Sequence, residues 1–446
     1  MAVALFGPPV QMYAGSTDAG LGLVVLGMAV GVQGCAPQYA PILYNGKLWR
    51  VVYTGGSIVN PAQIWMLVSS DSGVTWSVAD LAHSPTWSVP QPQAANPGGV
   101  VFDGDHSLIL AHTTASNTVG GPLQLQNFDL STGLWGAVYG TAGAPSCTTC
   151  SAAYLRSDGS LLVFFDGNLG TQVSAASYNA GIWTAPFACD TNFVAGGTAN
   201  DDLASVYDPT SGTVHCFLTG FDGSGNHHIL YQQVLLSNVL GVFQDFGPAD
   251  FDTSSGPRAN PIIVGENLLW GAEPVSDLYP TLLVGTPLAS PVFSLLPSPG
   301  IDPQGPGGGA SGLYSPYLFS DGSTISAVYV VTSGLGAQEI RVAQTSNLVN
   351  PALGWSASTV YSDPTAAAAF SGPSLMLFGR RLGITFEGPP PDFPVTGFNP
   401  STELFMATAM PPFPAAIIIR GVKRVPAPSC QNVAPAPISK RVKQAV

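Results

Sequence analysis

The stretch Ser69-Ser70-Asp71-Ser72-Gly73-Val74-Thr75-Trp76 directly follows an apolar run at residues 64–68. It predicts a strand, a tight turn and a second strand, because the Asp71 carboxylate can accept hydrogen bonds from the amides of the turn. Gly73 supplies a backbone conformation that residues with a Cβ rarely adopt, and Trp76 packs as the chain re-enters the sheet. The stretch therefore indicates a β-hairpin.

A glycine turn between two strand-like runs recurs seven times along the chain. Successive central glycines are 58, 55, 53, 53, 57 and 57 residues apart. They are Gly46, Gly104, Gly159, Gly212, Gly265, Gly322 and Gly379. A period in this range with four strands in each unit is typical of β-propeller blades.

The hairpin at residues 69–76 recurs with the same period in a less complete form. Its aromatic residue is kept where the aspartate is not, at Trp135, Trp183, Phe243, Phe293 and Trp355. We expect this aromatic to lie on the outermost strand of each blade and to pack between adjacent blades.

The pattern S-x-D-x-G-x-T-W resembles the Asp-box (BNR) repeat of sialidases and related β-propellers. All five fixed positions are filled, by Ser69, Asp71, Gly73, Thr75 and Trp76. In that family the Asp-box is a structural turn on the face away from the active site. The resemblance therefore implies an architecture and does not imply catalysis.

These repeats predict an all-β fold, a β-propeller of seven four-stranded blades over residues 36–415. A six-bladed ring with one unit outside it is the alternative. Residues 1–35 are expected to supply an extra strand that either closes the ring against the last blade or covers a face. Residues 416–446 contain no further repeat and are predicted to form a basic, proline-rich extended arm.

Composition supports this fold and limits the partners. The chain has 446 residues with 52 Gly, 40 Pro and only 9% charged residues, which argues against long helices. The net charge is −13, and the six cations after residue 415 are accompanied by no acid, so the body carries −13 − 6 = −19. An acidic body disfavours nucleic acid as a binding partner, whereas the basic arm is a candidate docking segment. Its cations are Arg420, Lys423, Arg424, Lys440, Arg441 and Lys443.

Cysteines and the N-terminus give weaker signals. The six cysteines are too scattered for a disulfide framework, and Cys147-Thr-Thr-Cys150 lacks the second ligand pair of a zinc site, so we predict buried or loosely paired thiols. No Lys or Arg precedes Lys47, so the cationic start of a signal peptide is missing. Residues 21–32 are apolar but too short to cross a membrane, and we predict a strand there.

The repeat also assigns residues to the two ends of the ring. The turns between first and second strands, and between third and fourth strands, lie at one end, which we name the turn end. The starts of the first strands and the ends of the second strands lie at the other, the connection end, where propellers usually bind ligands. The candidate ligand-binding residues at the connection end are Tyr39, Asp166, Asp201, Asp202, Arg258, Glu273, Tyr314 and Glu387.

Sialidase chemistry is not expected. That family needs an arginine triad around the substrate carboxylate, together with a Tyr–Glu nucleophile and an Asp acid/base. Of the six arginines in the body, only Arg258 is predicted to lie at the connection end, and an acidic rim would repel a sialic acid. We therefore assign no catalytic residue from the sequence.

A glycosidase acting on neutral sugars stays open. Two carboxylates roughly 5 to 9 Å apart would suffice, and Asp201 and Asp202 could meet Asp166 or Glu273 across the ring. The preferred interpretation is that these acids cap strand ends and are solvent-exposed charges at the rim.

Metal and cofactor binding are not predicted. Residues 221–228 have oxygen ligands at alternating positions, as calcium loops do, but the downstream bidentate glutamate is missing. The adjacent His227 and His228 are expected to face solvent.

The function predicted from the sequence is a non-catalytic β-propeller for binding or assembly, a structural or adhesion protein of a bacteriophage virion, associated with its capsid or tail. Asp-box propellers mostly work outside the cytoplasm, and release by host lysis would reconcile this with the missing signal peptide. The arm would then dock on other virion proteins in a symmetric assembly, with a cell-surface glycan as a further ligand and a virion or extracellular location. The alternatives are a glycoside hydrolase or lyase acting on a surface polysaccharide, and a lectin-like module.

Overall fold

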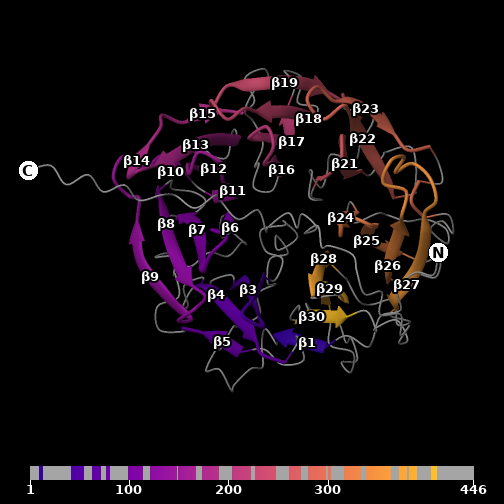
Figure 1. Cartoon of the computed structure of the whole chain (residues 1–446), viewed down its shortest axis with the longest axis horizontal. Coiled ribbons are helices and arrows are strands. Elements are labelled where there is room, and N and C mark those ends of the chain that lie inside the picture. The colour runs from indigo at the N-terminus through magenta and orange to yellow at the C-terminus, as the bar shows by residue number, and fades with distance from the viewer. Residues whose placement is uncertain are drawn as a thin grey trace, which may run out of the picture.

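The strands of the computed structural model form seven antiparallel sheets arranged around a central axis (Figure 1). The structure describes residues 10–13, 42–54, 63–71, 77–80, 99–113, 121–147, 149–166, 173–189, 203–221, 227–247, 261–272, 280–297, 300–302, 316–332, 338–362, 371–378, 381–388 and 403–408. Within these ranges no helix is long and apolar enough to span a membrane. The predicted all-β propeller is confirmed.

The first four sheets follow the chain in order, one repeat to a sheet. Blade 1 consists of β2 (Ile42–Tyr44), β3 (Lys47–Thr54), β4 (Gln63–Ser69) and β5 (Ser77–Ala79). Blade 2 consists of β6 (Val100–Phe102), β7 (Ser107–Thr113), β8 (Gly121–Asp129), β9 (Leu134–Tyr139) and β10 (Ser146–Cys147). Blade 3 consists of β11 (Thr149–Leu155), β12 (Leu161–Asp166), β13 (Val173–Asn179), β14 (Ile182–Trp183) and β15 (Phe187–Ala188). Blade 4 consists of β16 (Leu203–Asp208), β17 (Thr213–Phe221), β18 (His227–Val234) and β19 (Leu240–Asp245).

The last three sheets continue the series. Blade 5 consists of β20 (Ile262–Val264), β21 (Asn267–Ala272), β22 (Thr281–Thr286) and β23 (Val292–Leu295). Blade 6 consists of β24 (Tyr317–Ser320), β25 (Ile325–Thr332), β26 (Gln338–Thr345) and β27 (Ser356–Ser362). Blade 7 consists of β28 (Ser371–Phe378), β29 (Arg381–Gly388), β30 (Glu403–Thr408) and β1 (Val10–Tyr13).

The first chain segment closes the last sheet, because β1 pairs with β30 with Val10 opposite Met406. Of the two roles expected for the N-terminal strand, the pairing corresponds to ring closure. The division of the chain at residues 35 and 415 stays a prediction. The arm lies outside the described residues.

The core lies between the blades. In β12 all five apolar residues are buried, and alternate residues point to opposite faces of the sheet. Leu161, Val163 and Phe165 pack in the cluster shared with blade 2, whereas Leu162 and Phe164 pack in the cluster shared with blade 4. Apolar clusters likewise lie between successive blades from blade 1 to blade 6, so blades 2 to 5 are each covered by a neighbour on both sides.

The aromatic residue of the outer hairpin packs against the preceding blade, as the sequence predicts. Trp135 lies with the blade 1 residue Trp49 in one cluster, and its ring meets Phe128 with centroids 5.0 Å apart. Trp183 packs against blade 2, and Phe293 of blade 5 packs on Tyr231 of blade 4. The equivalent Trp76 lies outside the described residues.

The glycine turns also follow the prediction. Six of the seven repeat glycines lie in the left-handed region, with φ between 59° and 85°, and each separates the first and second strands of its blade. These are Gly46, Gly104, Gly159, Gly212, Gly265 and Gly322. Gly379 lies outside the described residues.

Two other glycines allow neighbouring blades to approach closely. A Cβ on Gly271 in β21 would lie 2.0 Å from the carbonyl oxygen of Pro316, which precedes blade 6. A Cβ on Gly99 would lie 2.2 Å from the backbone nitrogen of Ala153 in blade 3. Neither neighbour is a flexible side chain, so an added methyl group would separate the two blades.

We predict that Gly271→Ala lowers the free energy of unfolding by about 3 kcal/mol, because the new methyl group meets a fixed carbonyl at a blade interface. Gly136→Ala in β9 is the matched control, since its Cβ would lie 3.4 Å from the nearest atom, the carbonyl oxygen of Asn127. Chemical denaturation measures both variants. Equal losses of stability in the two would contradict the close approach.

Candidate functional site

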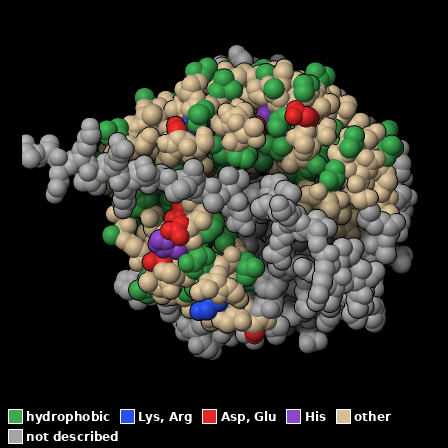
Figure 2. Space-filling view, viewed as in Figure 1, with side chains coloured by type: hydrophobic (Ala, Val, Ile, Leu, Met, Phe, Trp, Pro, Cys, Tyr) green, Lys and Arg blue, Asp and Glu red, His purple; other side chains and the backbone are tan. Residues whose placement is uncertain are grey.

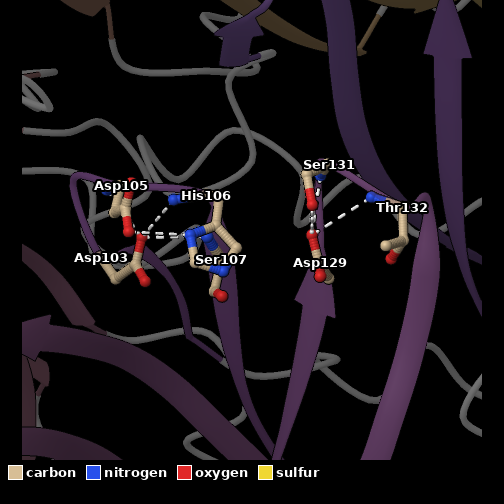
Figure 3. Close-up of polar contacts among 7 residues, drawn as sticks. All are labelled: Asp103, Asp105, His106, Ser107, Asp129, Ser131 and Thr132. Carbon is tan, nitrogen blue, oxygen red and sulfur yellow. Dashed lines mark hydrogen bonds and ion pairs between the residues drawn. The ribbon is translucent and has the colours of Figure 1, made fainter.

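The carboxylates at the turn end are used to build turns. Asp103 accepts hydrogen bonds at Oδ1 from the amides of Asp105, His106 and Ser107, at 2.9 to 3.1 Å (Figure 3). Asp129 Oδ1 likewise accepts from the Ser131 amide and hydroxyl, at 2.7 and 2.6 Å (Figure 3).

The same arrangement recurs in other blades. Asp158 accepts from the amide and hydroxyl of Ser160, Asp208 from those of Ser211, and Asp321 from those of Ser323. Burial raises the pKa of Asp208, but these hydrogen bonds outweigh it, and the pKa lies below its usual value of 3.8. Such carboxylates are ionised acceptors with structural partners, which makes them poor candidates for acid–base chemistry.

One histidine belongs to this acidic surface. Figure 2 shows acidic and histidine side chains together over β6 to β9, the strands around Asp103, Asp105, His106 and Asp129. His106 Nδ1 lies 2.8 Å from Asp105 Oδ2, and this hydrogen bond raises the pKa of His106 above 6.5. Within the described residues, no group of three or more His, Cys, Asp or Glu side chains could hold a metal ion.

The predicted ligand-binding residues fall mainly in the links between strands. Two lie in described strands, Asp166 as the last residue of β12 and Glu387 as the second-last residue of β29. The others lie outside the described residues: Tyr39, Asp201, Asp202, Arg258, Glu273 and Tyr314. Their assignment to a ligand-binding face stays a prediction, and residues 222–226, where no metal is predicted, also lie outside the described residues.

Asp166 and Glu387 occupy equivalent places in their blades. Each lies at the connection end of a second strand, where Asp166 pairs with Thr149 and Val173, and Glu387 pairs with Ser371 and Leu404. Blades 3 and 7 are three blades apart along one side of the ring and four along the other (Figure 1). The two strand ends are therefore on opposite sides of the central axis.

The connection end also contains a buried ionic cluster that the sequence analysis missed. Arg341 in β26 donates from Nη1 to Asp302 Oδ2 at 2.8 Å and from Nε to Glu339 Oε2 at 2.9 Å. Asp302 lies in the link between blades 5 and 6, and its side chain is fully buried. Burial lowers the pKa of Arg341, but the two carboxylates outweigh this and the pKa lies above its usual value.

This cluster fixes the chain between two blades. Glu339 also accepts a hydrogen bond from Thr359 Oγ1 at 3.0 Å, so β26 and β27 are joined to the same group. Burial raises the pKa of Tyr329 well above its usual value, and the charge of Asp302 raises it further, so the phenol stays protonated. Because Asp302 is buried and ion-paired, we interpret the cluster as a support for the connection end and not as a reacting group.

A histidine–aspartate pair lies at the same end of blade 4. His228 Nδ1 is 2.9 Å from Asp245 Oδ1, and Asp245 also accepts a hydrogen bond from the Gly247 amide at 2.7 Å. His228 is only 8% exposed, so the expectation that it faces solvent is wrong. Because this pair joins the two outer strands of its blade, it lies farther from the axis than Asp166 and Glu387 do.

Four cysteines are buried, as predicted: Cys147, Cys150, Cys189 and Cys216. Cys147 and Cys150 lie in the apolar cluster between blades 2 and 3. Burial raises the pKa of the Cys216 thiol well above its usual value, which makes it unreactive. Cys35 and Cys430 lie outside the described residues.

Comparison with solved structures finds chains of similar extent. Polysaccharide lyase Uly1 is 11% identical to this chain. The match covers 91% of this chain and 97% of the lyase chain, with a TM-score of 0.48. The α-L-arabinofuranosidase Arb93A from Fusarium graminearum is 13% identical, with coverages of 90% and 97% and a TM-score of 0.42. The β-propeller domain of the Trilobed protease from Pyrococcus furiosus is 7% identical, with coverages of 82% and 93% and a TM-score of 0.43. At these identities the similarity concerns the fold alone.

No family model matches the sequence, and no curated protein matches it. The principal functional prediction, a non-catalytic virion propeller for binding or assembly, is nevertheless corrected, because the similar chains include a polysaccharide lyase and α-L-arabinofuranosidases. The N-terminal sequence without early cations and the basic arm concern location and docking rather than chemistry.

Two buried histidines give the molecule a predictable pH dependence. His112, near the connection end of β7, is 2% exposed, and burial lowers its pKa to about 4. His215 in β17 is 1% exposed, and burial likewise lowers its pKa to about 4, although its Nδ1 lies 2.7 Å from the Tyr231 hydroxyl. The unfolded chain protonates both near pH 6.5, so folding favours their neutral forms.

We predict that the free energy of unfolding falls as the pH drops from 6.5 to 4, by about 3 kcal/mol for each of these histidines. His112→Gln should remove about half of this dependence, whereas His106→Gln, on the exposed turn end, should leave it unchanged. Denaturation at several pH values and NMR titration of the imidazoles measure both effects. Titration of His112 near pH 6.5 would disprove its burial as a neutral group.

Proposed function

We propose that the chain is a glycoside hydrolase that cleaves a polysaccharide at the connection end of the propeller, with a lyase of the same site as the second candidate. The observation behind this proposal is the equivalent placement of Asp166 and Glu387 at second-strand ends across the ring. The last two positions of the described second strands contain a carboxylate in these two blades alone.

Hydrolysis of a glycosidic bond needs two carboxyl groups roughly 5 to 9 Å apart, so a strand end of blade 3 or blade 7 would act together with a nearer partner acid. One carboxylic acid donates a proton to the leaving sugar oxygen as the bond breaks, and the other carboxylate activates a water molecule or attacks the anomeric carbon directly. The components of water are thereby added across the bond. Asp201 and Asp202, which precede β16, and Glu273, which follows β21, remain candidates for the partner group.

The contrast between the two ends supports placing the chemistry at the connection end. At the turn end five described carboxylates accept hydrogen bonds from the amides or hydroxyls of their own turns: Asp103, Asp129, Asp158, Asp208 and Asp321. Those bonds hold the acids ionised and fixed in the turns. Asp166 and Glu387 lie where second strands end, which is where propeller loops surround a ligand.

Charge favours a neutral substrate and therefore a hydrolase. The body carries a net charge of −19, and a polymer of uronic acids would be repelled by it. A lyase acting by elimination needs the acidic C–H group beside a uronic carboxylate, so its substrates are anionic. We therefore rank neutral polysaccharides first, and a substrate of this size implies an extracellular site of action.

We further propose that residues 69–76 form an Asp-box turn without sialidase catalysis. Ser69 Oγ donates to Asp71 Oδ1 at 2.8 Å, and Ser69 is almost fully buried. Gly73, Thr75 and Trp76 lie outside the described residues. Arg50 in β3 and Arg341 in β26 are both buried and cannot surround a substrate carboxylate from solvent.

The test is an activity screen on neutral polysaccharides such as arabinan, xylan and mannan, and on uronic polymers such as pectate and alginate. We predict new reducing ends from a neutral polymer. Asp166→Asn and Glu387→Gln should each lower the rate roughly 100-fold or more. Asp321→Asn, an acid of the turn end, should leave the rate unchanged and serves as the matched control.

The products distinguish the two candidates. Hydrolysis gives saturated sugars, whereas elimination gives an unsaturated sugar with a new ultraviolet absorbance. Thermal unfolding of each variant shows that the fold is intact. Retention of full activity in both Asp166→Asn and Glu387→Gln, or no cleavage of any polymer in the screen, would overturn the proposal.

A further inference from the structure

The outer strands of the seven sheets are almost without charge. Each is paired on one side only within the described residues, and together they contain a single charged residue, Asp245. These strands are β1, β5, β9, β14, β19, β23 and β27. Soluble proteins usually protect such edges with lysine, other charges or proline, because an open edge can pair with another chain.

Large apolar side chains are exposed on three of these strands. Leu134 in β9 is 51% exposed, Ile182 in β14 is 72% exposed and Val292 in β23 is 72% exposed. Val138 and Leu295 on the same strands are 44% and 42% exposed. We name these five residues the apolar rim.

The position of the apolar rim follows from the packing of the blades. Leu134, Ile182 and Val292 each directly precede the aromatic residue that packs on the preceding blade. Neighbouring residues in a strand point to opposite faces, so these three point towards the following blade. Blades diverge with distance from the axis (Figure 1), which leaves that side open at the circumference.

The arm contains a segment suited to such an edge. Residues 415–425 contain no proline, although Pro414 and Pro426 flank them. The segment has three consecutive isoleucines at 417–419 and a valine at 422, residues that favour strands. Its cations, Arg420, Lys423 and Arg424, are unaccompanied by acids, so it is attracted to a body with a charge of −19.

We propose that the chain self-associates by adding residues 415–425 of one copy as a strand to the apolar rim of a second copy. Backbone hydrogen bonds to the open edge give the contact its register, and the isoleucines cover the exposed side chains of β9, β14 or β23. The opposite charges of arm and body bring the two copies together and disfavour pairing between two rims. This inference is independent of the proposed hydrolase activity.

The test measures the mass of the full chain by sedimentation equilibrium over a range of concentrations. We expect self-association that weakens as salt is added. Ile418→Pro, which removes a backbone donor and fixes φ in the arm, should raise the dissociation constant roughly tenfold or more. The double variant Ile182→Lys with Val292→Lys should do the same, because it charges the rim at two exposed positions.

Val349→Lys is the matched control, since Val349 is 90% exposed but lies in a turn of blade 6 and not on an outer strand. It should associate like the natural chain. A monomer at every concentration would overturn the proposal, and so would unchanged association of Ile418→Pro. If the rim variant loses association while Ile418→Pro associates like the natural chain, then the rims pair with each other. That result would also contradict the proposed role of the arm.

Discussion

Each blade is too thin to bury its apolar residues alone, and this constraint determines the rest of the structure. β12 shows it most clearly, because alternate residues of one strand belong to the clusters on its two sides. A sheet that is apolar on both faces must be covered on both faces. In a ring every sheet has a neighbouring sheet on each side. The pairing of β1 with β30 completes the seventh sheet of this ring.

The ring separates structural turns from the region available for chemistry. At the turn end, glycines with positive φ and aspartates with fixed hydrogen bonds complete several of the links. At the connection end, Arg341 with Asp302 and Glu339 anchors one of the links. Acids with turn partners and acids at strand ends thus have different roles although their residue types are the same.

Periodic features could be predicted from the sequence. The glycine spacing gives the phase of the repeat, and the phase correctly places Arg50 on a second strand, Arg341 on a third strand and the aromatics between blades. The aperiodic features could not be predicted. Asp302 and Arg341 are 39 residues apart and meet through an irregular link, and His228 meets Asp245 through the register of β18 and β19. No regular spacing in the sequence predicts either contact.

The functional prediction was wrong for a related reason. A missing signal peptide and a basic arm describe location and docking, whereas chemistry depends on which carboxylates are used by turns, and that is visible only in three dimensions. We propose that a sugar binds at the second-strand ends of blades 3 and 7. The decisive experiment is a crystal structure of the Asp166→Asn variant soaked with an oligosaccharide substrate. Sugar density is expected at the connection end within reach of residue 166 or Glu387; density confined to the turn end beside Asp103 and Asp129 would rule this site out.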